Sequence, residues 1–236
     1  MTPTLQDFAE AAKRSAAAEQ QFLTALLDAT VYVHVPATPP PSGRLQLLQF
    51  TRPDNGQMVL PFFSDQAKAQ LAGLGQVGVQ ALPARQLLEL TRGATLMLNP
   101  TDEGYVLYPE EIAALLAGQP IGSFTTEHTT EDERVGIATP SVPTEALRTV
   151  LAAYCATEPL ITAGYLVQVH RGSNLEEASL LVDLVVPQAA AERVTRACIA
   201  AVQPVVFSLA LPLLLTCHDL EEPLCYEGSA CFYRAE

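Results

Sequence analysis

One stretch of the sequence, residues 118–140, differs in composition from the residues on either side of it. It is rich in Gly, Pro, Ser and Thr, it contains an acidic cluster, and it has few aliphatic side chains. Domain boundaries are usually found in segments of this kind, which contribute little to a hydrophobic core. The sequence therefore predicts two domains, residues 1–118 and residues 141–236, joined by a linker over residues 119–140.

The first half alternates between strand-like and helix-like patterns. Val31, Val33 and Val35 lie on one face of a predicted strand, and the Asp54-Asn55-Gly56 sequence is typical of a hairpin turn. The predicted strands lie at residues 30–35, 45–51, 58–63, 77–82, 94–98 and 105–107. The predicted helices lie at residues 3–28 and 83–90, with further helices beginning near Ser64 and at Pro109.

The second half restarts the same mixed pattern. Helices are predicted at residues 143–156 and 189–202, and strands at residues 164–171, 179–186 and 205–211. An order of helix, two strands, helix and strand favours a small sheet covered by helices on one face. We therefore predict an α+β protein of two domains, each a small mixed or antiparallel sheet packed against helices.

The charge balance excludes two classes of partner. The chain has 13 Lys and Arg against 26 Asp and Glu, which gives a net charge of −13. Such a chain is repelled by phosphate backbones and by anionic lipid, so we expect neither nucleic acid nor a membrane as a partner. Because 49% of the residues are hydrophobic, there is ample material for packed cores.

No segment of the chain has the pattern of a signal peptide or a membrane span. The most apolar window, residues 205–215, is interrupted by Ser208 and Pro212 and is shorter than the ~20 residues that a spanning helix needs. The 5 cysteines are an odd number at irregular spacing, which favours reduced thiols over a disulfide framework. We therefore expect a soluble, cytoplasmic protein.

Five short stretches, spread over nearly the whole chain, resemble motifs of one protein family and follow one another in the same order. They are ATVYVHVP (29–36), LPFFSD (60–65), LNP (98–100), GYVLYPEEI (104–112) and EPLITAGYL (158–166). In the first four the chain resembles the N-terminal domain of the SseB family, although Phe63 stands where the family usually has threonine. The last stretch is similar to the SseB C-terminal domain. The resemblance implies a bacterial, cytosolic, two-domain protein named for enhanced sensitivity to serine, with no established enzymatic activity.

The motifs that carry this resemblance supply the candidate binding residues. These are Ser64, Asp65, Asn99, Tyr105 and Glu110. Several of the motif positions have ordinary structural roles: Ser64 as a helix N-cap, the Asn99-Pro100 pair as a turn, and Pro109 as a helix start. The functional alternative is that the loops at residues 64–65 and 99–103 line one shared groove, because exposed loops often carry binding residues.

The sequence contains no catalytic or metal-binding motif. Zinc would need four N or S ligands, and the four candidates near the C-terminus are Cys217, His218, Cys225 and Cys231. Adjacent Cys and His residues rarely both reach one ion, so no metal is expected. Cys155 and Cys198 fall on predicted helices, where a thiol packs as a small hydrophobe. A G-x-G-x-x-G sequence at residues 73–78 lacks the flanking strand and helix of a dinucleotide site, so no cofactor is expected.

The absence of a catalytic motif favours a binding or regulatory module that acts without catalysis. Its partner would be another protein or a small metabolite. The alternative is an enzyme of amino-acid metabolism with a site near the Ser64 and Asn99 loops, which the serine phenotype of the family suggests. Residues 209–215 are apolar enough for a homodimer interface, but a place in the core is favoured because large apolar patches are seldom exposed.

Overall fold

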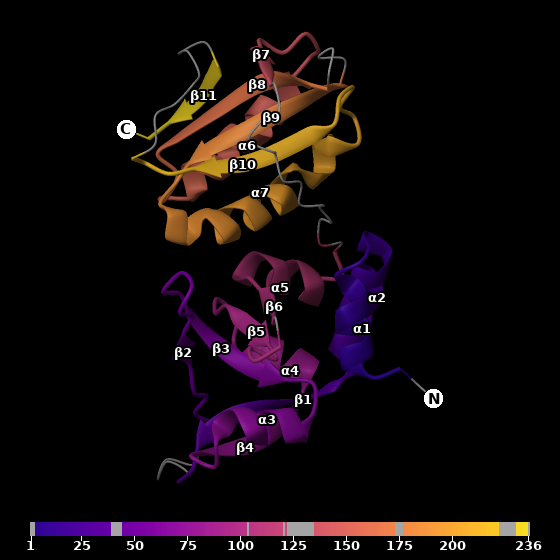
Figure 1. Cartoon of the computed structure of the whole chain (residues 1–236), viewed down its shortest axis with the longest axis vertical. Coiled ribbons are helices and arrows are strands. Elements are labelled where there is room, and N and C mark those ends of the chain that lie inside the picture. Colours follow the sequence, from indigo (N-terminus) through magenta and orange to yellow (C-terminus); the bar gives the residue numbers. More distant parts are fainter. Residues whose placement is uncertain are drawn as a thin grey trace. The chain divides into compact units, whose positions relative to one another are not determined.

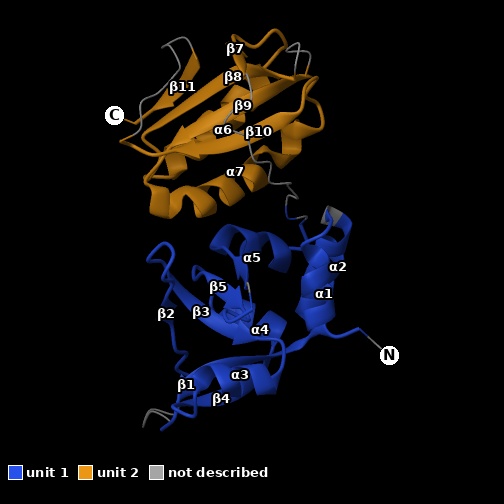
Figure 2. Cartoon of the chain, in the orientation of Figure 1, with its two compact units in different colours: residues 1–123 blue, residues 124–236 orange. Residues whose placement is uncertain are grey.

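The chain folds into two units, residues 1–123 and residues 124–236, and each is built around its own sheet (Figures 1 and 2). The structure is a computed structural model that describes residues 3–38, 44–102, 104–119, 121, 135–172, 177–221 and 230–235. Each sheet is mixed and is accompanied by helices, so the predicted α+β class is confirmed. Most of the predicted linker, including its acidic cluster, lies outside the described residues, and the predicted domain bounds stay a prediction.

The first unit contains five helices and six strands among its described residues. The helices are α1 (Leu5–Ala12), α2 (Ala16–Asp28), α3 (Gln66–Gly73), α4 (Ala84–Leu90) and α5 (Pro109–Leu116). The strands are β1 (Thr30–Pro36), β2 (Phe50–Thr51), β3 (Met58–Phe63), β4 (Val77–Pro83), β5 (Leu96–Leu98) and β6 (Tyr105–Leu107).

The sheet of the first unit has the strand order β4-β1-β3-β5-β6, and β2 also pairs with β3. Strands β3 and β5 are parallel, and the other neighbours are antiparallel. A parallel pair needs a crossover connection, and here the chain between β3 and β5 runs through α3, β4 and α4. The carboxyl ends of β3 and β5 therefore meet at the same end of the sheet.

The segment predicted as one helix over residues 3–28 forms two helices, α1 and α2, so the prediction is wrong where the chain breaks between them. Ser15 has an extended backbone, and its side chain accepts a hydrogen bond from the Ala18 N–H at 3.2 Å. This is the geometry of an N-cap, and it starts a new helix after α1 ends near Lys13. At the start of α1, Thr4 and Asp7 form a capping box.

The strand predicted over residues 45–51 shrinks to the two residues of β2. One backbone bond, from the Leu48 N–H to the His34 carbonyl oxygen at 3.0 Å, ties residues 44–49 to β1 without a continuous ladder. The predicted hairpin is confirmed: Gly56 has a φ of 71°, and β2 pairs antiparallel with β3 on either side of the turn.

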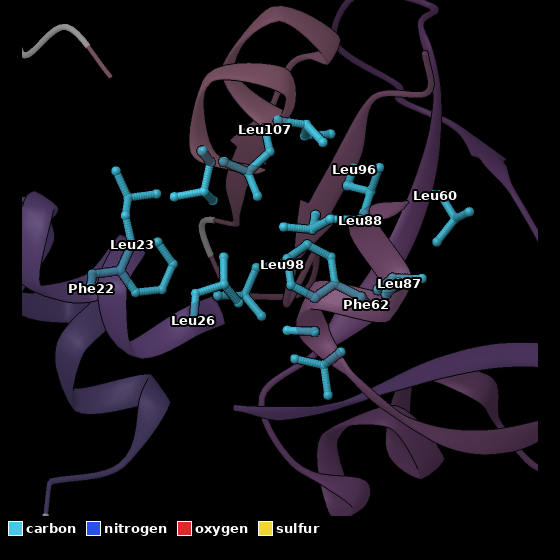
Figure 3. Close-up of a cluster of buried hydrophobic side chains, with 14 of the residues drawn as sticks. Phe22, Leu23, Leu26, Leu60, Phe62, Leu87, Leu88, Leu96, Leu98 and Leu107 are labelled. Atoms are coloured by element: carbon cyan, nitrogen blue, oxygen red, sulfur yellow. The ribbon is translucent and has the colours of Figure 1, made fainter. Parts of the chain in front are cut away.

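A single cluster of buried side chains forms the core of the first unit (Figure 3). It joins Phe22, Leu23 and Leu26 of α2 to side chains of α4 and of the strands β3, β5 and β6. The labelled residues of α4 and these strands are Leu60, Phe62, Leu87, Leu88, Leu96, Leu98 and Leu107. Burial of leucine and phenylalanine side chains thus holds the sheet to these helices, as the large share of hydrophobic residues in the sequence predicts.

The second unit holds a five-stranded sheet of order β10-β9-β8-β11, with β7 also paired to β8. Its strands are β7 (Gly136–Ala138), β8 (Ala163–Arg171), β9 (Glu177–Val185), β10 (Leu213–His218) and β11 (Cys231–Arg234). The helices are α6 (Glu145–Thr157) and α7 (Ala191–Val206), preceded by a short 3-10 turn at Gln188–Ala190. Both helices pack on one apolar core with Leu166, Leu180 and Leu184 of the sheet, so they cover the same face, as predicted.

The strand predicted over residues 205–211 is wrong. Helix α7 continues through Pro204 to Val206, and the following strand, β10, begins only at Leu213, after Pro212. A short apolar run has no period of its own, so it fits a helix end as well as a strand. Leu209 and Leu211 pack against the buried cluster of this unit, which is the core role favoured over a dimer interface. Within the described residues, no helix combines the length and the apolar character that crossing a membrane requires.

Candidate functional site

Ser64 and Asn99 lie directly after the two parallel strands, and the structure brings them together. β3 pairs with β5 through Phe62 and Leu98, so the residues that follow both strands meet at one end of the sheet. The Ser64 N–H donates a hydrogen bond to Oδ1 of Asn99 at 3.0 Å. Loops at the carboxyl ends of parallel strands are common places for ligand sites, which is why the contacts of these residues decide what the region can do.

Asn99 holds the centre of this network. It is only 3% exposed, and its φ of 46° lies in the left-handed region that asparagine tolerates better than most residues. Its Nδ2 donates to Oε1 of Gln6 at 2.6 Å and to Oγ of Ser64 at 3.0 Å. Both the oxygen and the nitrogen of this amide are therefore hydrogen-bonded to other residues of the protein. Gln6 was missed by the sequence analysis, because nothing in the pattern of α1 distinguishes it from an ordinary exposed glutamine.

Asp65, rather than Ser64, caps helix α3, so the predicted N-cap is off by one residue. Oδ1 of Asp65 accepts from the Lys68 N–H at 2.9 Å, and Oδ2 accepts from the Ser64 hydroxyl at 3.2 Å. Because Ser64 is bonded to Asn99, the next residue takes the capping position. The Lys68 ammonium also pairs with Asp102 in the turn after Asn99, and this hydrogen bond holds the pKa of the Asp102 carboxyl below its ordinary value.

Tyr105 lies on the neighbouring strand β6, and Glu110 lies on α5. Tyr105 pairs across the sheet with Leu98, but its hydroxyl donates to Oε1 of Glu19 at 2.5 Å and ties β6 to α2. Glu110 is exposed on the first turn of α5. The buried neighbour, Glu111, accepts a hydrogen bond from the Tyr108 N–H at 2.9 Å and so fixes the start of that helix.

The imidazole of the first unit is engaged elsewhere. His34, on β1, places Nε2 2.8 Å from the carbonyl oxygen of Ala69 in α3, and its ring centroid lies 4.7 Å from that of Phe63. An amino-acid enzyme built on Ser64 and Asn99 would need a proton acceptor beside the serine hydroxyl. The groups that this hydroxyl contacts in the described residues are the Asp65 carboxylate and the Asn99 amide.

The four described thiols of the second unit, those of Cys155, Cys198, Cys217 and Cys231, are buried or half-buried. Burial raises the pKa of Cys155 to about 12 and also raises the pKa values of Cys198 and Cys217. Cys217 Sγ lies 3.1 Å from Oγ1 of Thr195, on the helix side of the sheet. A thiol with a raised pKa is a poor nucleophile, so none of these three is suited to covalent chemistry.

The predicted zinc candidates do not assemble in the described residues. His218 follows Cys217 in β10 and therefore points to the opposite face, where its Nδ1 lies 3.7 Å from Oδ2 of Asp183. Cys225 lies outside the described residues. Over the described ranges, no three His, Cys, Asp or Glu side chains come together in a way that could hold a metal ion.

A groove that no motif indicated lies on the first unit, between the turn at Arg92–Gly93 and one side of α5. Its volume is about 250 Å³. The lining residues are Arg92, Gly93, Pro109, Ile112, Ala113, Leu116 and Ala117. Arg92 is exposed, and no hydrogen bond or ion pair of its side chain is found within the described part of the chain. The groove thus combines an apolar wall with one available guanidinium.

Comparison with known proteins identifies the first unit. A family model for the SseB protein N-terminal domain matches residues 5–114, a range that contains all five candidate residues as well as Gln6 and Arg92. Protein SseB of Escherichia coli (strain K12) is 32% identical over 130 residues, and Protein SseB of Shigella flexneri is equally similar. By sequence, residues 5–114 are therefore an SseB-type N-terminal domain.

The likeness covers part of each SseB protein. The aligned residues make up 50% of this chain and 48% of each SseB relative, so the chain spans about half the length of the curated relatives it matches. No solved structure matches the chain significantly. That the second unit is an SseB C-terminal domain stays a prediction.

Proposed function

We propose that this chain is an SseB-family protein, a cytoplasmic, non-catalytic regulatory module linked to serine sensitivity, and that it binds a partner protein in the groove between Arg92 and α5. The observation that carries the proposal is the available guanidinium of Arg92 beside an apolar wall. In a chain with a net charge of −13, an arginine with no ion pair among the described residues is unusual, and arginine is enriched at the energetic centres of interfaces.

The size and charge of the groove define the chemistry of its occupant. A volume of about 250 Å³ is smaller than a typical cofactor site and suits one apolar side chain. A carboxylate next to that side chain would pair with the guanidinium, which binds carboxylates with two parallel hydrogen bonds. The proposed partner therefore presents an apolar residue beside an acidic one, or an apolar C-terminal residue.

The contacts around Asn99 support a binding module over an enzyme. The side chains of Ser64, Asp65 and Asn99 form hydrogen bonds within this group, with Gln6, and with the backbone at the start of α3. A catalytic serine would instead need a base in hydrogen-bond reach and room for a substrate. The convergence of these residues is nevertheless what the alternative, an enzyme of amino-acid metabolism, would build on, so the experiment includes a test for it.

The test compares Arg92→Gln with Arg85→Gln, because Arg85 is an exposed arginine of α4 outside the lining of the groove. Each tagged variant and the wild type are used to capture proteins from a bacterial lysate. We expect one partner to be retained by the wild type and Arg85→Gln, and to bind Arg92→Gln about 10- to 100-fold more weakly, as expected for a lost charge-assisted hydrogen bond.

Melting temperatures measured with and without each amino acid distinguish the partner-binding module from the amino-acid enzyme. The proposal is contradicted if Arg92→Gln captures the same partner as strongly as the wild type. The enzyme alternative gains instead if one amino acid raises the melting temperature of the wild type, this shift is lost in Ser64→Ala, and no partner depends on Arg92.

A further inference from the structure

Strand β4 is the edge of the first sheet. It covers seven residues, Val77–Pro83, and pairs along its whole length with β1 on one side. Among the described residues, no strand pairs with its other side. A strand edge presents unpaired N–H and C=O groups, and these can pair with a further strand.

The ladder between β1 and β4 shows which backbone groups point outward. The Ala84 N–H donates to the Ala29 carbonyl oxygen at 2.9 Å, so the pair just beyond the strand is hydrogen-bonded. Antiparallel pairs alternate between bonded and non-bonded, which makes the pairs of Val77, Val79 and Ala81 non-bonded toward β1. His34, the partner of Val79, agrees with this, because its carbonyl oxygen accepts from Leu48 instead.

Three N–H groups therefore point away from the sheet, those of Val77, Val79 and Ala81. Pro83 is the next residue in this outward series, and its missing N–H costs the β1 ladder nothing. Its carbonyl oxygen still points outward. The outer edge of β4 thus offers donors from three residues and acceptors from four. One of these acceptors, the Ala81 carbonyl oxygen, already takes one hydrogen bond from Nε2 of Gln80 at 3.0 Å and keeps its second lone pair for a partner.

The edge has few of the usual protections against pairing, and its one proline, Pro83, stands at its last position. Edge strands are commonly kept apart by short length, by bulges or by charged side chains, and β4 has an unbroken register and no charged residue. Of the other described edges, β6 has three residues, and β11 has four and contains Arg234. β10 is the edge most like β4, with six residues and no Asp, Glu, Lys or Arg, but it is one residue shorter. At the start of β4, Leu71 and Leu74 are 76% and 77% exposed.

Charge favours a second copy of this chain as the occupant. No acidic residue occurs in β4, in its neighbour β1 or in the adjacent helix α3, whereas the whole chain carries 26 acidic residues. Two copies of a chain with a net charge of −13 repel each other over most of their surfaces. This edge is a place where they can approach without bringing carboxylates together.

We propose that β4 pairs antiparallel with β4 of a second copy, centred on Gln80. In this register Val79 lies opposite Ala81 of the partner subunit, and each can donate to and accept from the other. The Val77 N–H reaches the carbonyl oxygen of the partner's Pro83. All outward donors of the edge are then satisfied, and the two first sheets become one continuous sheet. Gln80 lies opposite its own copy, in a non-hydrogen-bonded pair.

A proline substitution tests this pairing without touching the ladder to β1. Ala81→Pro removes an outward N–H and adds a ring on the outer side, at a position where edge strands tolerate proline. Ala81→Thr is the matched control, because it keeps the N–H and favours a strand. We expect sedimentation equilibrium to give the dimer mass for the wild type and Ala81→Thr, and the monomer mass for Ala81→Pro.

Hydrogen exchange gives a second readout at single residues. In the dimer the amides of Val77, Val79 and Ala81 are bonded across the interface, and we expect them to exchange slowly. In Ala81→Pro the amides of Val77 and Val79 should exchange rapidly, while those of Gly78 and Gln80, bonded to β1, remain slow. The retained slow amides also show that the variant is folded.

The proposal is overturned if the wild type is a monomer, or if folded Ala81→Pro keeps the dimer mass. If Ala81→Pro unfolds, two charge variants test the register instead. Gln80→Lys and Gln80→Glu should each weaken the dimer, because like charges then face each other. An equal mixture of the two should restore the dimer, because opposite charges then face each other. Failure of the mixture to restore a dimer weakened by both variants also overturns the register. Arg92→Gln should leave the dimer mass unchanged, which separates this inference from the proposed partner groove.

Discussion

Asn99 and Arg92 lie seven residues apart in the sequence, yet their side chains are in opposite situations. The Asn99 amide is buried and bonds to Ser64 and Gln6, whereas the Arg92 guanidinium is exposed at the rim of an apolar groove. The first residue belongs to a recognisable motif, and the second belongs to none. The motif residues Ser64 and Asn99 thus hold loops in place, whereas no sequence pattern marks the surface where Arg92 is available for binding.

The two situations have different energetic consequences. Removing a buried group leaves its former partners without hydrogen bonds, which costs more than the bond itself contributed. Removing an exposed charge without a partner changes stability little. We therefore expect variants of the Asn99 network to lose stability and variants of Arg92 to keep it, and the variants below test the two regions separately.

The largest effect is expected for Asn99→Ala. The Ser64 N–H loses its acceptor, Gln6 loses its donor, and alanine must adopt the left-handed backbone that asparagine tolerates. We expect the free energy of unfolding to fall by about 2–4 kcal/mol, from the unsatisfied groups and the backbone strain together. Urea denaturation monitored by circular dichroism measures this change.

Asn99→Gly is the matched control, because glycine accepts a φ of 46° but lacks the amide. It should be more stable than Asn99→Ala by the backbone strain, roughly 1–2 kcal/mol, but should remain less stable than the wild type because the hydrogen bonds of the amide are still missing. Equal stability of wild type and Asn99→Ala would show that the network does not hold the loop.

An intermediate effect is expected for Glu111→Ala, which links the two regions because α5 lines the groove. The Glu111 carboxylate is buried and accepts from the Tyr108 N–H, so its loss frees the first turn of α5. We expect a destabilisation of about 1–2 kcal/mol, as for other helix caps, together with weaker capture of the partner. Differential scanning calorimetry measures the first change.

Glu110→Ala is the control for Glu111→Ala, since Glu110 is exposed one residue earlier in the same turn. Its effect should stay within about 0.5 kcal/mol. If both variants lose the same stability, the start of α5 is held by surface charge and not by the buried carboxylate.

The sequence predicted the fold where local signals and tertiary contacts agree. β1, the hairpin at Gly56 and the start of α5 follow from alternation, turn chemistry and a proline at the first helical position, and the structure has all three. The failures have physical causes. The break at Ser15 needs one capping bond inside an alanine-rich stretch, and the run after Pro204 has no period that separates helix from strand.

The candidate site was predicted only in part for the same reason. The sequence offered a groove shared by the Ser64 and Asn99 loops as the alternative to structural roles; the structure shows that the two residues are hydrogen-bonded to each other. Gln6 is 93 residues away from Asn99 in the chain, and no local pattern points to such a pairing. The groove at Arg92 depends on how a turn lies against α5, which is a property of the folded unit and not of any segment.

The smallest effect is expected at the rim of the Asn99 network, where Lys68 pairs with Asp102. This hydrogen bond holds the pKa of Asp102 below its ordinary value of 3.8, so the pair stabilises the fold above that value and is lost as the pH falls through the lowered pKa. The Asp102 side chain is 40% exposed, and solvent limits the contribution to less than about 1 kcal/mol. Asp102→Asn should therefore be slightly less stable than the wild type at about pH 7, and the gap should narrow as the pH falls below 3.8 and through the lowered pKa of the carboxyl. Urea midpoints of both proteins, measured over a series of pH values from neutral into acid, follow the gap. A gap that persists unchanged in acid would mean that Asp102 acts through its shape in the turn, and that the network ends at Asp65.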